Sequence, residues 1–234
     1  FSCYGQAAQY DEKSAGAAQK RKPAGPLPGF EISETELSSI YGRPVMLVPV
    51  VKHAPTIDAD PNDPVWKNVK GIQLGYLDSK FPGIETVNPT TVKIVSDKKH
   101  LYLLAKCHEN NVEKIKVHDD CRWTDDIVDL EFDIGRSLDY QQWYLAEVNS
   151  KGSFMLRRNR FDSRWKPKSL IVKGKVYNKQ WVVELKIAFK DFAVDKDNFP
   201  KVWGANFFRS RWVDRPSWDD PNCAKWDLAW HGNS

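Results

Sequence analysis

Residues 123–133 read Trp123-Thr124-Asp125-Asp126-Ile127-Val128-Asp129-Leu130-Glu131-Phe132-Asp133, a polar loop that leads into a β-strand. Apolar and acidic residues alternate from position 128 onward. Because successive side chains of a strand point to opposite faces, Asp129, Glu131 and Asp133 share one face. Buried carboxylates need an arginine, a cation or the hydroxyls of a ligand, whereas carboxylates on an open face are satisfied by water. The pattern therefore predicts a strand with one core face and one face that is either a binding face or merely solvated.

Strand-like segments continue on both sides of this stretch, with turn sequences between them. Short strands joined by close turns are typical of antiparallel hairpins, so the sequence predicts an all-β fold, an antiparallel two-sheet β-sandwich of jelly-roll-like type. Short helices are expected only at Glu31–Ser39, Val65–Lys70 and Phe189–Phe192. The expected strands are Val92–Ser96, Leu101–Cys107, Ile127–Asp133, Trp143–Asn149, Phe154–Arg160, Leu170–Tyr177, Trp181–Ile187 and Trp203–Trp212.

The N-terminal part differs in composition from the rest of the chain. It is rich in Ala, Gly, Gln, Lys and Pro without periodicity, so residues 1–40 are predicted to be a flexible, disordered tether before a domain at 41–234. Arg43–Lys52 is apolar, but two prolines confine it to a sheet edge.

Composition and charge narrow the class of protein. No apolar run approaches the roughly 20 residues that span a bilayer. The net charge is +4, with 35 basic and 31 acidic residues, which gives little reason to expect nucleic acid as a partner. The chain has ten tryptophans, more than core packing alone explains. An exposed tryptophan ring offers a flat apolar surface on which a sugar can stack.

The four cysteines, Cys3, Cys107, Cys121 and Cys223, lack the spacing of zinc or c-type haem sites. Disulfides in an exported protein fit them better, and a chain that opens without methionine is consistent with a processed product. We expect a secreted or cell-surface protein, periplasmic or extracellular, with Cys3 as a candidate site for a lipid anchor.

Six segments, taken in order, resemble the family 9 carbohydrate-binding modules and their DOMON-like relatives. The resemblance implies a calcium-stabilised β-sandwich that binds polysaccharide or oligosaccharide without cleaving it. It also implies a closing strand that we do not recognise before Ser234, so we expect either that the sequence is truncated there or that another segment, Arg43–Lys52 or a partner strand, covers that sheet edge. The segments are Ile57-Asp58 with Asp63-Pro64-Val65-Trp66, Leu101–Ala105, Trp123–Phe132, Tyr144–Gly152, Trp181–Ile187 and Trp203–Arg209.

Sugar-binding members of that family hold a terminal sugar ring between two tryptophans. By resemblance, Trp123 is the first of these, and either Trp226 or Trp230 is the second. Asp129 stands where a glutamate is usual, and Tyr144 replaces an arginine found in some members. The full set of candidate sugar-binding residues is Trp123, Asp126, Asp129, Tyr144, Glu147, Asn149, Arg209, Trp226 and Trp230.

Two features of the candidate loops lead to further expectations. Acidic residues cluster there, and calcium prefers such oxygen ligands, so Asp125 and Asp126 are candidate metal ligands. Cys121 lies two residues before Trp123, and Cys223 lies three residues before Trp226. A Cys121–Cys223 disulfide would therefore hold the two loops together. A Cys107–Cys121 bridge and free thiols are the alternatives.

Other functions are less well supported by the sequence. Adjacent carboxylates such as Asp125 and Asp126 rarely flank a scissile bond, and no nucleophile motif is present, so no enzymatic activity is expected. No haem is expected, because only Met46 and Met155 could serve as methionine ligands. Glu131, Glu147 and Arg209 could instead form an internal ion-pair network. The protein could then be a surface or assembly module that has lost sugar binding.

A basic run, Arg157–Lys168, holds six basic residues and one acidic residue. A solvated hairpin edge explains this run most simply. The alternative is contact with an anionic glycan or an acidic surface partner, which salt would weaken.

Overall fold

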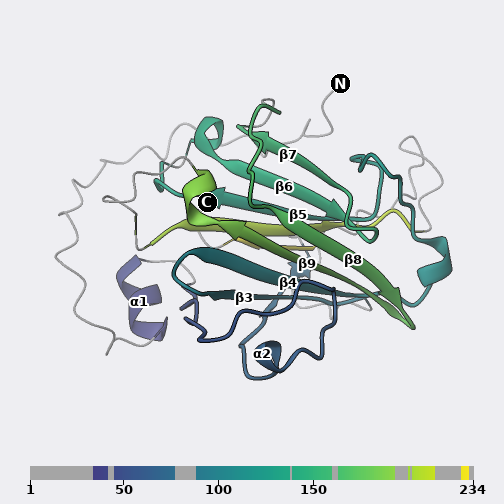
Figure 1. Cartoon of the computed structure of the whole chain (residues 1–234), viewed down its shortest axis with the longest axis horizontal. Coiled ribbons are helices and arrows are strands. Elements are labelled where there is room, and N and C mark those ends of the chain that lie inside the picture. Colours follow the sequence, from purple (N-terminus) through teal and green to yellow (C-terminus); the bar gives the residue numbers. More distant parts are fainter. Residues whose placement is uncertain are drawn as a thin grey trace, which may run out of the picture. The chain divides into compact units, whose positions relative to one another are not determined.

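The strands of the computed structural model form two antiparallel sheets that pack face to face (Figure 1). The structure describes residues 34–41, 45–76, 88–137, 139–159, 163–192, 200, 202–213 and 228–231. In order across the five-stranded sheet lie β1 (Ile72–Gln73), β3 (Thr90–Ser96), β4 (His100–His108), β9 (Gln180–Ala188) and β8 (Ile171–Tyr177). The six-stranded sheet contains β2 (Gly75–Tyr76), β11 (Leu228–His231), β10 (Gly204–Ser210), β5 (Ile127–Asp133), β6 (Tyr144–Asn149) and β7 (Phe154–Arg158).

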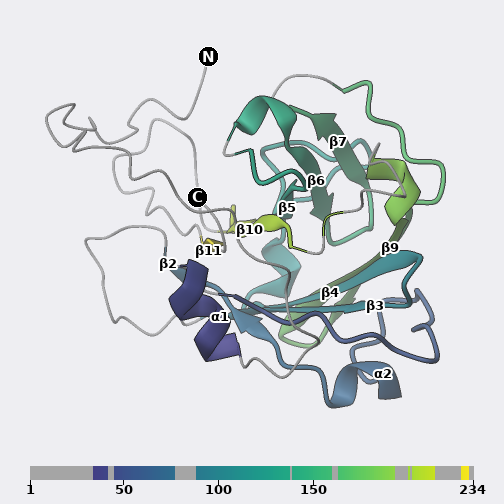
Figure 2. The same cartoon turned by 90° about the vertical axis from the view of Figure 1, so that its left-hand side faces the viewer.

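The main core lies between the two sheets (Figure 2). Every second residue of the central strands points into it, as the period-two pattern predicts. Leu103 and Leu185 contribute from the five-stranded sheet, and Val128, Leu130 and Phe207 contribute from the six-stranded sheet. The predicted all-β sandwich is therefore confirmed, and each predicted strand after residue 90 is present with its ends shifted by no more than two residues.

A second, smaller core covers the opposite face of the five-stranded sheet. It is built by the segment from Val51 to Val69, which includes the short helix α2 (Pro64–Lys67). Proline suits the first turn of this helix, and the Asp63 side chain caps it by accepting the N–H of Val65 at 2.9 Å. Trp66 is thereby held fully buried against the sheet.

Glu184, a buried residue of β9, fixes this segment to the sheet. One oxygen of its carboxylate accepts the indole N–H of Trp66 at 2.8 Å, and the other accepts the N–H groups of Asp58 and Ala59 at 3.0 and 2.9 Å. Burial raises the pKa of Glu184, while these three donors oppose that rise. A buried carboxylate thus joins two segments that are more than one hundred residues apart in the sequence.

The remaining helices are short. α1 spans Glu34–Tyr41, later than the predicted Glu31–Ser39, and η4 spans Phe189–Phe192 as predicted. Two further single turns are η2 (Val112–Lys114) and η3 (Tyr140–Gln142). No helix in the described ranges is long and apolar enough to cross a membrane.

The edges of the sheets differ from the prediction. β11 pairs with β10, so it is the closing strand that the sequence did not reveal. The segment predicted as an edge strand, Arg43–Lys52, does not cover that edge. Of its described residues, 45–52, only Val50 forms a bridge, to Ser96 of β3 in the other sheet, because a proline lacks the N–H group that a ladder needs.

The two sheets also meet through backbone at one point beside β8. The turn between β6 and β7 approaches β8 so closely that a Cβ atom added to Gly174 would lie 2.3 Å from the nitrogen of Gly152 and 2.5 Å from the carbonyl oxygen of Ser150. Only glycine allows this contact.

Candidate functional site

The outer face of the six-stranded sheet carries the polar residues that the strand pattern predicted. Asp129 of β5 stands opposite Phe208 of β10 on one side and Glu147 of β6 on the other. Glu131 stands opposite Asn206, whose amide donates to its carboxylate at 3.3 Å. One cross-strand row therefore holds an aromatic residue and two acids, and the other holds an amide beside an acid.

Asp133, the third carboxylate of the pattern, has a local structural role instead. It is buried, and its side chain accepts the backbone N–H of Ser137 at 3.0 Å and the hydroxyl of the same residue at 3.1 Å. This carboxylate therefore closes the turn after β5 and is not available to a ligand.

Glu147 forms an ion pair with Arg157 of the neighbouring strand β7. The Arg157 guanidinium donates to its carboxylate at 2.7 Å and also contacts the Met155 sulfur at 3.2 Å. Burial raises the pKa of Glu147, and the positive charge of Arg157 opposes this rise. The Arg157 side chain is 24% exposed and that of Glu147 only 10%, so the guanidinium is the more accessible group of the pair.

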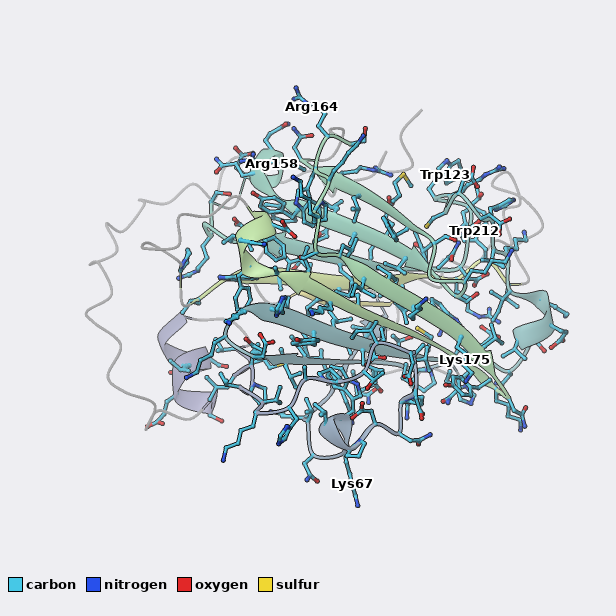
Figure 3. All side chains as sticks on the ribbon, viewed as in Figure 1. Lys67, Trp123, Arg158, Arg164, Lys175 and Trp212 are labelled. Atoms are coloured by element: carbon cyan, nitrogen blue, oxygen red, sulfur yellow. The ribbon has the colours of Figure 1, made fainter. Side chains whose placement is uncertain are left out.

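Trp123 lies at one end of this face, in the loop that precedes β5 (Figure 3). Its side chain is 49% exposed, the largest exposure of any tryptophan among the described residues. The ring of Trp212, which is only 4% exposed, packs edge-on against it with centroids 5.9 Å apart and planes at 70°. A buried aromatic ring thus supports an exposed one and limits its motion.

Asp126 joins the Trp123 loop to the segment that carries Trp212. One oxygen of its buried carboxylate accepts the backbone N–H of Trp212 at 2.9 Å, and the other accepts that of Lys116 at 2.8 Å. The Lys116 ammonium lies 5.8 Å from the centroid of the Trp212 ring. Asp126, predicted as a sugar ligand, therefore positions the loop rather than contacting a ligand.

Asp125 has a comparable structural role next to Asp126. Its buried carboxylate accepts the N–H groups of His118 and Arg122 and the side-chain amide of Asn149, and it pairs with the His118 ring. Burial opposes ionisation, but these bonds hold the pKa of Asp125 below its usual value. Asn149 is itself buried and binds the β6–β7 turn, so the structure does not bring it to the exposed face.

Cys121 lies between the loop and the carboxylates. Its buried thiol donates to the carbonyl of Glu147 at 3.5 Å. Burial raises its pKa to about 12, helped by the negative charges of Asp125, Glu147 and Asp129. The bond from the Cys121 thiol joins the Trp123 loop to β6 at Glu147. A thiol with so high a pKa is a poor nucleophile.

Two predicted ligands lie on the opposite, core side of the sheet. Tyr144 is buried and packs edge-on against Trp165 and Phe192. Its position in β6 has the same parity as the core residues Ala146 and Val148, so its side chain points inward.

Arg209 is fully buried and belongs to a charge network at one end of the sandwich. Its guanidinium donates to Glu109 at 3.1 Å, and Arg211 donates to the same carboxylate at 2.6 Å. It also lies 5.6 Å from the centroid of the Trp181 ring. The alternative prediction of an internal ion-pair network is therefore correct for Arg209. The carboxylate that pairs with Arg209 belongs to Glu109, however, and not to Glu131 or Glu147.

Several predictions concern the C-terminal part of the chain. Trp226 and Cys223 lie outside the described residues. Trp230 belongs to β11, where it stands opposite Phe207. Cys107 and Cys121 are both free, buried thiols, so neither the expected Cys121–Cys223 disulfide nor the alternative bridge is formed.

The residues present do not fit the expected calcium site. No group of three or more His, Cys, Asp or Glu side chains in the described ranges could hold a metal ion. Asp125 and Asp126 direct their oxygens at N–H groups, which compete with a cation. Of the two methionines considered for haem, Met46 packs on the core and Met155 contacts Arg157.

Sequence reasoning missed Trp212 and Arg157. Both could have been found by extending the period of two. Trp212 follows Phe208, which faces outward, by an even number of residues. Arg157 follows Met155, the cross-strand neighbour of Glu147, by two residues and so belongs on the same face as Met155.

Comparison with solved structures identifies the fold. The chain is similar to a family 9 carbohydrate-binding module from Caldicellulosiruptor kristjanssonii in complex with cellotriose, with a TM-score of 0.51, 17% identity, and 70% of this chain and 75% of that chain covered. It is also similar to a presumed carbohydrate-binding protein from Bacteroides uniformis, with a TM-score of 0.54, 15% identity, and 78% and 87% covered. No protein-family model and no curated protein matches the sequence. The chain therefore has the fold of the family 9 carbohydrate-binding modules.

Proposed function

We propose that the chain binds carbohydrate, without catalysis, on the outer face of the six-stranded sheet next to Trp123. The observation that carries the proposal is an exposed tryptophan that rests on a buried one, Trp212, in the loop that leads into the strand carrying Asp129. The carbon-bound face of a sugar ring can stack on Trp123. Its hydroxyls can then donate to Asp129 and Glu147 and accept from Arg157.

The fold supports this proposal, because the similar module from Caldicellulosiruptor kristjanssonii was solved with cellotriose. The buried residues beneath the face support it too. Asp125 and Asp126 fix the Trp123 loop through backbone N–H groups, so the loop is organised before a ligand arrives. A preorganised loop loses less conformational entropy on binding than a mobile one.

Isothermal titration calorimetry with cellotriose, followed by a panel of neutral oligosaccharides, tests the proposal. Trp123→Ala should weaken the binding of any sugar that the chain recognises by about 1–3 kcal/mol, the usual contribution of an aromatic contact at the centre of a binding site. Its melting temperature should change little, since Trp123 is half exposed.

Phe154→Ser is a matched control, because Phe154 is an aromatic residue of similar exposure on another part of the surface. It should leave sugar binding unchanged. If no oligosaccharide binds, or if Trp123→Ala unfolds the protein without a specific loss of affinity, the site is wrong. The alternative function, a surface or assembly module without a sugar site, would then be favoured.

An exported or cell-surface location with a lipid anchor at Cys3, and a bound calcium ion, remain predictions that accompany this proposal. Acyl-group labelling of cells that produce the protein tests the anchor. A fall in melting temperature on addition of EDTA would support the calcium prediction, and an unchanged melt would count against it.

A further inference from the structure

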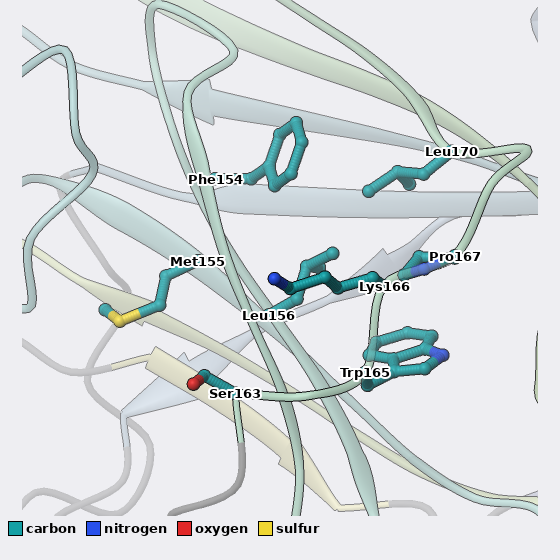
Figure 4. A pocket seen from close by; sticks show the side chains of 8 residues that line it. All are labelled: Phe154, Met155, Leu156, Ser163, Trp165, Lys166, Pro167 and Leu170. Carbon is teal, nitrogen blue, oxygen red and sulfur yellow. The ribbon is translucent and has the colours of Figure 1, made fainter.

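A pocket separate from the Trp123 face opens between β7 and the segment 163–170 that leads into β8 (Figure 4). Its volume is about 400 Å³, which falls within the usual range for ligand pockets. The walls are mainly apolar and consist of Phe154, Leu156, Trp165, Pro167 and Leu170. The pocket therefore offers an apolar group a place to leave water.

The pocket contains few groups that could bind a hydroxyl. The indole N–H of Trp165 already donates to the carbonyl of Asp191 at 2.8 Å, and Figure 4 shows this nitrogen turned away from the pocket. Only Ser163 and Lys166 bring other polar side chains to the lining. A sugar placed here would leave most of its hydroxyls without partners, which is unfavourable.

Apolar side chains are also exposed on the two strands beside the pocket. Phe154 of β7 is 45% exposed and Val176 of β8 is 47% exposed. β7 and β8 are the outermost strands of their sheets within the described ranges. Outermost strands can pair with an extended peptide through their backbone N–H and C=O groups.

This edge is also strongly basic. Its described residues, 157–159 and 163–179, include eight Lys or Arg residues and no acidic residue, although the whole chain has a net charge of only +4. Arg158, Arg164, Lys166, Lys168 and Lys175 are all exposed, and Figure 3 shows Arg158 and Arg164 near the β7 end and Lys175 on β8. The acids packed nearby are Glu147, which pairs with Arg157, and Asp191, which accepts from Ser169.

We propose that this pocket and its basic rim bind an acidic, extended segment of a partner polypeptide, with an apolar side chain of that segment in the pocket. The acidic residues of the segment complement the basic rim, and its backbone lies along β7 or β8. An acidic polysaccharide would match the charges but not the apolar walls. This second site is independent of sugar binding at Trp123.

Fluorescence anisotropy with a labelled peptide, Glu-Glu-Leu-Glu-Phe-Glu-Glu, tests the proposal on the full chain. Two control peptides carry Ser in place of Leu and Phe, or Lys in place of Glu. The parent peptide should bind at least about 10-fold more tightly than either control, because each control lacks one of the two complementary features. Binding should weaken steeply between 0.1 M and 1 M salt, where the Debye length falls from about 10 Å to about 3 Å.

Variants of the pocket locate the site. Phe154→Ser and Lys166→Glu replace exposed side chains, so both should fold, which circular dichroism can check. Each should weaken peptide binding by about 10-fold or more, whereas Trp123→Ala should bind the peptide normally. The proposal is overturned if the parent peptide does not bind, if the Ser-containing control binds equally well, or if the two variants leave its affinity unchanged. Binding of polygalacturonate in place of the peptide, with the same dependence on Phe154, would also overturn it.

Discussion

Gly174 gives the sharpest test of the packing between the two sheets. In Gly174→Ala the new Cβ would lie 2.3 Å from the nitrogen of Gly152, whereas ordinary contact begins at 3.4 Å, so the two backbones would have to separate by about 1 Å. The contacted atoms, the Gly152 nitrogen and the Ser150 carbonyl oxygen, belong to the backbone, so no side chain can rotate away to make room. The turn that would have to move is held by its own bonds, including Gly152 N–H to the Asn149 carbonyl at 2.9 Å. Its displacement therefore disturbs the Asn149 contacts beneath the Trp123 loop as well.

We expect Gly174→Ala to lower the free energy of unfolding by about 2–3 kcal/mol, toward the upper end for overpacking. For a domain of this size that corresponds to about 4–12 °C in melting temperature. Urea and thermal unfolding measure the loss. Gly135→Ala is the matched control, because nothing lies within 4 Å of its added Cβ. If both variants melt within about 1 °C of the wild type, the close approach of the turn to β8 is incorrect.

Three further predictions concern buried groups. Trp66→Phe removes the N–H donor to Glu184 and should lower the free energy of unfolding, measured with urea, by about 1.5–3 kcal/mol. Trp66→Leu removes the same donor together with more of the ring. If Trp66→Leu costs no more than Trp66→Phe, the loss comes from the hydrogen bond and not from packing. The lowered pKa of Asp125 means that its ionised form contributes stability above the ordinary pKa of 3.8, and that this contribution is lost as the pH falls through the lowered value. The difference in melting temperature between wild type and Asp125→Asn should thus be large at neutral pH and shrink in acid; a constant difference would contradict it. Cys121, whose pKa is raised to about 12, should react with Ellman's reagent only after unfolding, and rapid labelling of the folded protein would show that it is accessible.

The sequence predicted most of the sandwich because its strands alternate clearly. β5 begins and ends at the predicted residues, Ile127 and Asp133, and apolar and acidic side chains alternate in it from Val128 onward. β11 escaped prediction because a four-residue strand, Leu228–His231, is too short for its alternation to stand out, and its pairing with β10 is a long-range contact.

The candidate site was predicted only in part, and parity explains the errors. Trp123 and Asp129 are where the pattern placed them, on a loop and on the outer face. Tyr144 and Arg209 were assigned by resemblance, yet both share the parity of core residues in their own strands, so the period of two already pointed them inward. Sequence spacing could not show that Asp126 is buried, because its N–H donors come from Lys116 and Trp212, ten and 86 positions away.

The bond between Glu184 and the segment before β1 bears on how this domain can be moved into other proteins. A fragment that began at β1 would contain all the strands, but it would leave a carboxylate in β9 without the donors from Asp58, Ala59 and Trp66 and would uncover an apolar sheet face. Such a fragment would lose solubility as well as stability. A fusion protein that keeps the chain from about Val51 onward retains both sides of the five-stranded sheet, so the natural junction for grafting lies before α2 and not before the first strand.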